Sequence, residues 1–152
     1  MSAPHSSAVQ TANHFKIGDA VIAPGEVRTI EIPVAPTYAH DDLAMSAHVI
    51  HGRRAGPALF VCAAIHGDEI NGIEIIRRVL KRVDAKKLRG TLVAIPIVNV
   101  YGVISHSRYL PDGRDLNRSF PGSANGSLTG RVAHTFMQEI VSNCTHGIDL
   151  HT

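Results

Sequence analysis

An unbroken apolar segment constrains the fold of this chain more than any other feature. Residues 58–65 read ALFVCAAI and are bounded by Pro57 on one side and by His66-Gly67 on the other. A continuous apolar run of this length is typical of a strand that is buried on both faces, as in a parallel sheet beneath helices. The segment therefore predicts a central strand of an α/β fold.

The residues that follow extend this strand into a strand–helix–strand unit. Over residues 70–83, apolar side chains recur every three or four positions opposite a basic face, which predicts an amphipathic helix. Gly90 separates this helix from residues 91–98, TLVAIPIV, which we interpret as another buried strand. A βαβ unit of this kind is right-handed in nearly all proteins. Two parallel strands of one sheet are therefore expected, with a helix on one face.

The remaining segments complete the predicted architecture. Residues 1–14 are small and polar and are expected to form a disordered tail. Alternating patterns over residues 27–34 and 43–50 predict strands of a small β segment that spans residues 15–52. Beyond a long loop over residues 99–126, we expect a helix over 128–141 and a short strand over 147–151. The predicted fold is thus α/β, with a mixed, mostly parallel sheet and helices on both faces.

Composition narrows the class of protein. Apolar residues make up 44% of the 152 residues, charged residues 18%, and the net charge is +2. These values are typical of a soluble domain, and they indicate neither a nucleic-acid-binding surface nor a membrane span. The basic cluster of the predicted helix (Arg77, Arg78, Lys81, Arg82) is interpreted as a solvated face. We expect a cytoplasmic protein with Cys62 and Cys144 as buried thiols, although a single disulfide is also possible. No feature of the sequence predicts an oligomeric state.

Three residues predict a metal site. His66 and Glu69 form an H-x-x-E pair directly after the first buried strand, and His151 ends the last predicted strand. Ends of neighbouring parallel strands lie ~5 Å apart, so these side chains could share one cation. Two histidines and one glutamate are a common ligand set for catalytic zinc, which keeps one position open. We expect one Zn²⁺ per chain, although iron or cobalt also suits these ligands.

The long loop contains a second group of polar residues. Residues 108–118 read RYLPDGRDLNR and place three arginines and an asparagine among glycine and proline. The simplest interpretation is a solvated surface loop with a Pro-Asp-Gly turn. Arginine, however, binds carboxylates through paired hydrogen bonds, and this loop follows the predicted metal ligands in the chain. The alternative interpretation is therefore a binding site for a small carboxylate substrate.

Three motifs together resemble one enzyme family. HGDE after a buried strand, DGRDLNRSFPG in a loop and DLH at a strand end occur in this order over residues 57–152. They resemble the zinc carboxypeptidase superfamily, and within it the succinylglutamate desuccinylase/aspartoacylase family. The resemblance implies that residues 53–152 are the N-terminal part of a zinc-hydrolase catalytic domain. It also implies a deacylase that cleaves the amide bond of an N-acyl amino acid or a similar carboxylate.

The resemblance also assigns roles to individual residues. His66, Glu69 and His151 match the zinc ligands, and Asp115 matches the carboxylate that orients the first histidine. The Asn117-Arg118 pair of the loop motif matches the residues that bind the substrate carboxylate. Arg108 resembles the arginine that polarises the scissile carbonyl, with Arg114 as the alternative.

The sequence departs from the family pattern in one respect. Family members use a glutamate general base well beyond the third ligand, whereas this chain ends at Thr152. Glu74 and Glu139 lie in predicted helices and are not candidates, so we expect a fragment of a longer enzyme that is inactive alone. Two alternatives remain: a metallocarboxypeptidase or peptidoglycan-type peptidase, and a non-catalytic metal-binding module.

Overall fold

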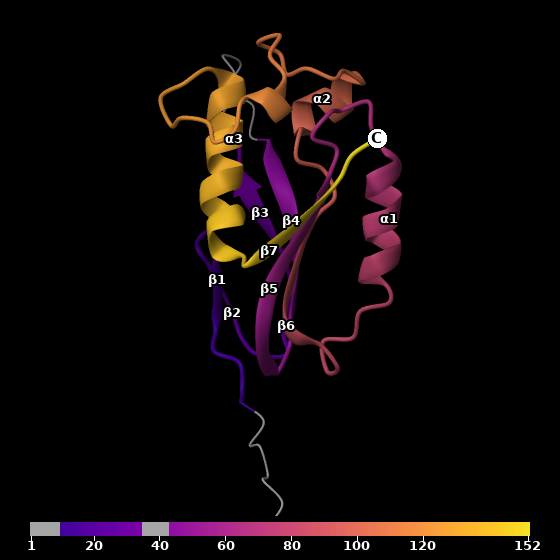
Figure 1. Ribbon diagram of the computed structural model, residues 1–152, viewed down its shortest axis with the longest axis vertical. Coiled ribbons are helices and arrows are strands. Elements are labelled where there is room, and N and C mark those ends of the chain that lie inside the picture. The colour runs from indigo at the N-terminus through magenta and orange to yellow at the C-terminus, as the bar shows by residue number, and fades with distance from the viewer. Residues whose placement is uncertain (1–9, 35–42) are drawn as a thin grey trace, which may run out of the picture.

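A five-stranded sheet forms the centre of the protein (Figure 1). The structure is a computed structural model and describes residues 10–34 and 43–152. The sheet has the strand order β3-β4-β6-β5-β7, and a separate two-stranded hairpin, β1-β2, lies beside it. The strands are β1 Phe15–Ile17, β2 Ala20–Ile22, β3 Val27–Pro33, β4 Ala44–His51, β5 Arg54–Ala63, β6 Arg89–Ile95 and β7 His146–Leu150. The helices are α1 Asn71–Leu80, α2 Val100–Ser105, η1 Leu116–Arg118, α3 Leu128–Glu139 and η2 Val141–Asn143.

The sheet is mixed, as predicted, but it is not mostly parallel. β5 pairs in parallel with β6 and with β7, whereas the β3–β4 and β4–β6 pairs are antiparallel. Both antiparallel pairs involve the segment over residues 15–52, which was predicted to be a small β segment separate from the catalytic domain. β4 alternates buried and partly buried residues and pairs directly with β6, so β3 and β4 extend the same sheet. Pairing between segments this far apart in the chain leaves no local sequence pattern.

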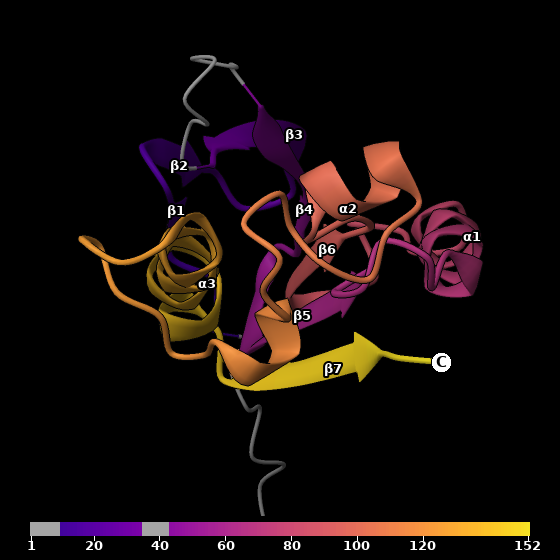
Figure 2. The same cartoon turned by 90° about the horizontal axis from the view of Figure 1, so that it is seen from above.

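Helices cover both faces of the sheet, as the sequence predicted (Figure 2). The side chains of β5 alternate between these faces. Phe60 and Cys62 pack into the larger core with Val132 and Phe136 of α3. Val61 and Ala63 point the other way and belong to a smaller cluster that includes Ile76 of α1. Burial on both faces is the physical reason for the unbroken apolar sequence of β5.

α1 is shorter than the predicted helix over residues 70–83. It ends at Leu80, and its apolar face is only partly covered, since Ile76 is buried whereas Ile75 and Val79 remain partly exposed. On the solvent side, Arg77 and Arg78 both form ion pairs with Glu74. The basic cluster is therefore a solvated helix face, as predicted from its spacing.

Residues 99–126 were predicted to form an irregular loop, but they contain α2 and η1. The Asn99 side chain accepts a hydrogen bond from Gly102 N at 2.8 Å and so caps the first turn of α2. Asp115 caps η1 in the same way, with Asn117 N as the donor. Short helices that depend on such caps, one with a glycine in its middle, lack the long apolar periodicity that reveals a helix.

The first described residues lie against the sheet. Residues 10–14 were predicted to be disordered, but Thr11 forms a bridge with Arg54, and Ala12 N donates to Arg53 O at 3.0 Å. The rest of the predicted tail, residues 1–9, lies outside the described residues. Cys62 and Cys144 are both free thiols, Cys62 buried and Cys144 partly buried. Within the described parts of the chain, every helix is too short or too polar to cross a bilayer.

Candidate metal and substrate site

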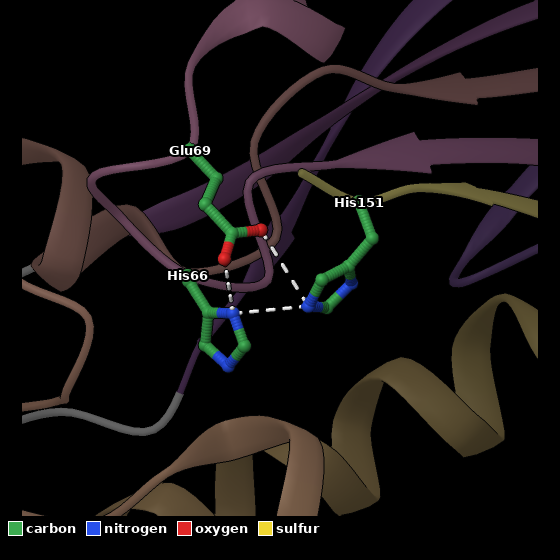
Figure 3. A group of neighbouring side chains, drawn as sticks. All are labelled: His66, Glu69 and His151. Atoms are coloured by element: carbon green, nitrogen blue, oxygen red, sulfur yellow. Dashed lines mark hydrogen bonds and ion pairs between the residues drawn. The ribbon is translucent and has the colours of Figure 1, made fainter.

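The predicted metal ligands meet at the carboxyl ends of two neighbouring parallel strands. β5 and β7 run side by side, with Ala63 opposite Leu150, so the residues that follow both strands leave the sheet at the same edge. Figure 3 shows His66, Glu69 and His151 around a common point. His66 is fully buried, Glu69 is mostly buried, and His151 is more open to solvent. Open α/β sheets commonly bind ligands at this edge.

The donor atoms of the three side chains lie close together (Figure 3). His66 Nδ1 is 2.9 Å from Glu69 Oε1 and 3.0 Å from His151 Nε2. His151 Nε2 is 3.5 Å from Glu69 Oε2. One donor atom from each residue lies within 4.8 Å of the other two, and the imidazole rings are perpendicular to each other. This arrangement can hold a single cation between two imidazole nitrogens and one carboxylate.

Glu69 is held in its charged form. Burial alone would raise the pKa of its carboxyl group. The hydrogen bonds from Thr152 N and from His66, together with the charges of His151 and His66, have the larger combined effect and lower this pKa below its ordinary value. An ionised carboxylate among the candidate ligands favours a bound cation.

Asp115 lies behind His66, on the side away from Glu69. His66 Nε2 is 3.0 Å from Asp115 Oδ1, which also accepts from Asn117 N at 2.9 Å. Burial alone would raise the pKa of Asp115. The hydrogen bond and charge of His66 and the hydrogen bonds from Asn117 N and Arg108 together have the larger effect, so this pKa lies below its ordinary value. A carboxylate in this position fixes the orientation of a histidine ligand. The structure thus places Asp115 beside His66, and its role in orienting this histidine on a metal stays a prediction.

Arg108 joins this group, whereas Arg114 contributes elsewhere. Arg108 Nε and Nη2 both donate to Asp115 Oδ2 at 3.2 Å, and Arg108 Nη1 is 3.6 Å from Glu69 Oε1. Arg114 is exposed, and its charge and backbone N–H act on Asp112. Of the two arginines left open by the sequence, Arg108 is therefore the one beside the candidate ligands.

Asn117 and Arg118 lie at the exposed rim of the site, in η1. Arg118 is 86% exposed at its side chain, and its Nε is 3.9 Å from Asp115 Oδ2. Asn117 is also exposed, while Leu116 between them is fully buried and anchors the turn in the core. Both polar side chains can therefore reach a ligand that approaches from solvent.

One contact of the site was not predicted from the sequence. His151 Nδ1 is 2.8 Å from Asp149 Oδ2. Asp149 lies in β7 and His151 directly follows it, with Leu150 between them, so the two side chains lie on the same side of the chain. An Asp-x-His pattern at the end of a strand could have predicted this contact.

Comparison with known proteins identifies the family of this chain. The sequence profile of the family described as Succinylglutamate desuccinylase/Aspartoacylase catalytic domain matches residues 55–152. The N-alpha-acetyl-L-2,4-diaminobutyric acid deacetylase of Halomonas elongata is 29% identical over 124 residues, which are 81% of this chain and 36% of the relative. The chain thus spans about a third of the length of this curated relative.

Solved structures of related proteins share the fold. An aspartoacylase family protein from Mesorhizobium loti has a TM-score of 0.76 and 29% identity over 85% of this chain and 41% of its own. A product-bound structure of the ectoine utilization protein EutE from Ruegeria pomeroyi has a TM-score of 0.72 and 26% identity over 86% of this chain and 42% of its own. With the family profile covering more than half of its residues, this chain belongs to the succinylglutamate desuccinylase/aspartoacylase family.

Proposed function

We propose that this chain forms part of a zinc-dependent deacylase, which hydrolyses the amide bond of an N-acyl amino acid or a similar carboxylate. The convergence of His66, Glu69 and His151 at one edge of the sheet carries the proposal. The deacetylase activity of the Halomonas elongata relative supports the deacylase class. Because the chain spans only part of its relatives, the proposal concerns a protein of their length.

The donor set fits zinc. Two imidazole nitrogens and one carboxylate are a frequent ligand set of catalytic zinc and leave room for water or substrate. Asp115 behind His66 supplies the outer partner that such sites use to orient a histidine. When bound, zinc would supply Lewis-acid catalysis, which polarises a carbonyl group and activates water near neutral pH. Iron or cobalt could occupy the same ligands, so metal analysis must identify the ion.

The residues of the rim would bind and orient the substrate. Arg118 and Asn117 are exposed beside the ligands and would hold the substrate carboxylate, for which the planar guanidinium is well suited. Arg108, with Nη1 close to Glu69, would stabilise negative charge on the carbonyl oxygen, an effect worth ~3 kcal/mol for one good donor. The loop of residues 108–118 thus provides the substrate-facing cations.

We assign the general base to a residue outside this chain. Glu74 forms ion pairs with Arg77 and Arg78 on the solvent side of α1, and Glu139 lies near Gly18 of the β1–β2 hairpin. Neither carboxylate is placed to take a proton at the candidate ligands. We propose that, in a protein as long as the relatives, a glutamate outside this chain has this role. We also propose that this chain alone binds metal without hydrolysing substrate.

Metal analysis tests the ligand assignment directly. We expect about one zinc per purified chain, and loss of this zinc in the His66→Ala and His151→Ala variants. His146→Ala, at the opposite end of β7, is the matched control and should keep its zinc. Full zinc content in His66→Ala would show that the ligand assignment is wrong.

A substrate panel on a protein of the relatives' length separates the enzyme classes. A deacylase should hydrolyse N-acyl amino acids and leave short peptides intact, whereas a metallocarboxypeptidase or a peptidoglycan-type peptidase should show the reverse preference. A protein that binds zinc tightly but hydrolyses neither class would be a non-catalytic metal-binding module. The Arg118→Ala variant should raise KM for N-acyl amino acids more than it lowers kcat, because Arg118 contacts the unreacting carboxylate.

A further inference from the structure

Asn99 lies fully buried at the point where the chain passes from β6 into α2. Its backbone N–H donates to Ala64 O at 2.9 Å, which ties the residue to the chain just beyond the end of β5. A buried carboxamide needs partners for both its oxygen and its NH2 group, because an unpaired polar group away from water is costly. The contacts at the two ends of the Asn99 side chain therefore show which segments it holds together.

The oxygen and the nitrogen of this amide contact different segments. Asn99 Oδ1 accepts from Gly102 N at 2.8 Å and caps α2. Asn99 Nδ2 donates to Arg108 O, which lies 3.4 Å away. Gly102 leaves the space that the amide occupies, since a Cβ atom at this position would lie 2.5 Å from Asn99 Nδ2. The amide thus connects the first turn of α2 to the backbone of Arg108.

The guanidinium of Arg108 is held only loosely by its own contacts. Its Nε and Nη2 lie 3.2 Å from Asp115 Oδ2, and its Nη1 lies 3.6 Å from Glu69 Oε1. Hydrogen bonds between charged N–H groups and carboxylates are usually ~2.7–2.9 Å long. The Arg108 side chain is also 40% exposed, and ion pairs this open to water restrain a side chain weakly. The position of the guanidinium therefore depends on where the backbone of Arg108 lies.

The backbone before Arg108 is fixed to the loop that carries the first two candidate ligands. Ser107 O accepts from Gly67 N at 3.0 Å, and Ser107 N donates to Gly102 O at 2.9 Å. The contact between Asn99 Nδ2 and Arg108 O extends this hold by one residue, to Arg108 itself. Beyond this point the chain continues into Tyr109, whose side chain is exposed. Asn99 therefore acts where the anchored backbone gives way to the open loop.

We propose that Asn99 is a positioning residue, which fixes the backbone of Arg108 and so directs the Arg108 guanidinium toward the candidate site. Its importance for the reaction rests on the proposed function, in which Arg108 stabilises negative charge on the substrate carbonyl oxygen. The position of Arg108, however, is a property of this chain and can be measured without metal or substrate. Asn99 thereby couples the end of β5, the start of α2 and the substrate-facing loop through one amide.

Hydrogen exchange of the Arg108 Nε–H group, followed by ¹H–¹⁵N NMR of the metal-free chain, tests this role. Serine is also a good N-cap, so the hydroxyl of Asn99→Ser can accept from Gly102 N, but it is too short to reach Arg108 O. We expect the Arg108 Nε–H to exchange ~3–10-fold faster in this variant, as the loss of one neutral hydrogen bond implies. The Gly102 N–H should keep its protection. Arg108→Lys identifies the Nε–H signal by removing it.

Two further variants make the result decisive. Asn99→Thr, another cap-forming substitution that fills more of the same space, should behave like Asn99→Ser, so poor folding of one variant does not decide the outcome. Asn143→Ser is the matched control, because the Asn143 side chain donates to Glu139 O at the end of α3, and exchange at Arg108 should stay unchanged. Unchanged exchange at Arg108 in both Asn99 variants would overturn the proposal. Equal loss of protection at Gly102 N–H would overturn it too, since Asn99 would then support α2 in general.

Zinc content, measured separately on the unsubstituted chain, distinguishes failure of this proposal from failure of the proposed function. If the chain binds no zinc but Arg108 responds to Asn99→Ser as expected, the metal site fails and Asn99 still positions Arg108. If the chain binds zinc and Arg108 does not respond, only the role of Asn99 is wrong.

Discussion

Asp115 connects three parts of the site through one carboxylate. Its oxygens contact His66 Nε2, Arg108 Nε and Nη2, and Asn117 N, at 2.9–3.2 Å. Removing it would free the His66 ring, take from the Arg108 guanidinium its two hydrogen bonds to Asp115 and uncap η1. We expect Asp115→Ala to weaken zinc binding ~10–100-fold, and to lower the free energy of unfolding by ~1–3 kcal/mol. Chelator competition and urea unfolding measure these two effects.

A second variant separates the charge of Asp115 from its shape. Asp115→Asn should keep the cap of η1, since the amide oxygen still accepts from Asn117 N, but it should weaken the hold on Arg108. Its loss of stability should therefore be smaller than that of Asp115→Ala. Equal zinc affinity in all three proteins would contradict the positioning role of Asp115.

The residues of the site differ in how well the sequence predicted them. His66, Glu69 and His151 could be brought together in prediction because the first two follow a buried strand, the third ends another predicted strand, and strand ends of a parallel sheet share an edge. Their role as ligands stays a prediction until metal is measured. The choice between Arg108 and Arg114 could not be made from the sequence, since it depends on how the loop folds around Asp115.

At the scale of elements, the loop after β5 crosses α2 at very close range. A Cβ atom added to Gly67 would lie 1.9 Å from the backbone carbon of Gly102, and Gly67 N donates to Ser107 O at 3.0 Å. This crossing fixes the loop that carries His66 and Glu69. Gly67→Ala must displace one of the two backbones, and we expect it to lower the free energy of unfolding by ~1–3 kcal/mol and to weaken zinc binding.

Gly130→Ala is the matched control for Gly67→Ala. A Cβ atom at Gly130 would make ordinary contacts, with Ser127 Oγ at 3.4 Å as its nearest neighbour, and the residue lies in the first turn of α3. Alanine is a better helix former than glycine, so this variant should gain ~0.5–1 kcal/mol. Thermal unfolding of both variants tests the close approach, and similar stability of the two would contradict it.

Elements with regular patterns were predicted well, and those fixed by distant contacts were not. Residues 58–65, 70–83, 91–98 and 128–141 correspond to β5, α1, β6 and α3, with shifts at their ends. α2 was missed because six residues around Gly102 have no apolar period and depend on the side chain of Asn99. The place of β3 and β4 in the main sheet was missed because no local pattern reveals which strands pair.

At the scale of the whole molecule, the connections between parallel strands leave one end of the sheet free for the site. α1 links β5 to β6 across one face, and α3 lies on the opposite face before β7 (Figure 2). The loops that carry the candidate ligands and Asp115 therefore gather beyond the carboxyl ends of the strands. The paired strands thus position the loops, and the polar contacts of the candidate site lie beyond the strand ends.

Acid should destabilise the whole fold through the carboxylates that anchor the site. The Asp112 carboxylate accepts hydrogen bonds from the backbone N–H and hydroxyl of Thr129, which tie the loop of residues 108–118 to the first turn of α3. Burial raises the pKa of Asp112, but the bonds from Thr129 and Arg114 and the charge of Arg114 lower it below its ordinary value. The pKa values of Glu69 and Asp115 are also lowered.

The sign of the pH effect follows from these shifts. Because the folded-state pKa of Asp112 is lower than the unfolded value of about 3.9, the unfolded chain binds the proton first as the pH falls. The stabilisation is complete above the unfolded pKa and is lost as the pH falls through the folded pKa. Urea unfolding should show a constant free energy of unfolding between roughly pH 5 and 7 and a decline below that range.

Asp112→Asn tests how much of this acid sensitivity the loop anchor carries. The variant should be less stable than the unsubstituted chain near pH 7, and the difference should shrink as the pH falls below about 3.9, the unfolded pKa of an aspartate, because protonation then removes the stabilisation by the Asp112 carboxylate. Thr129→Ser keeps the hydroxyl donor and is the matched control, so its decline should parallel that of the unsubstituted chain. A stability difference for Asp112→Asn that is the same at every pH would show that the charged carboxylate does not anchor the loop, leaving Glu69 and Asp115 as the sources of acid sensitivity.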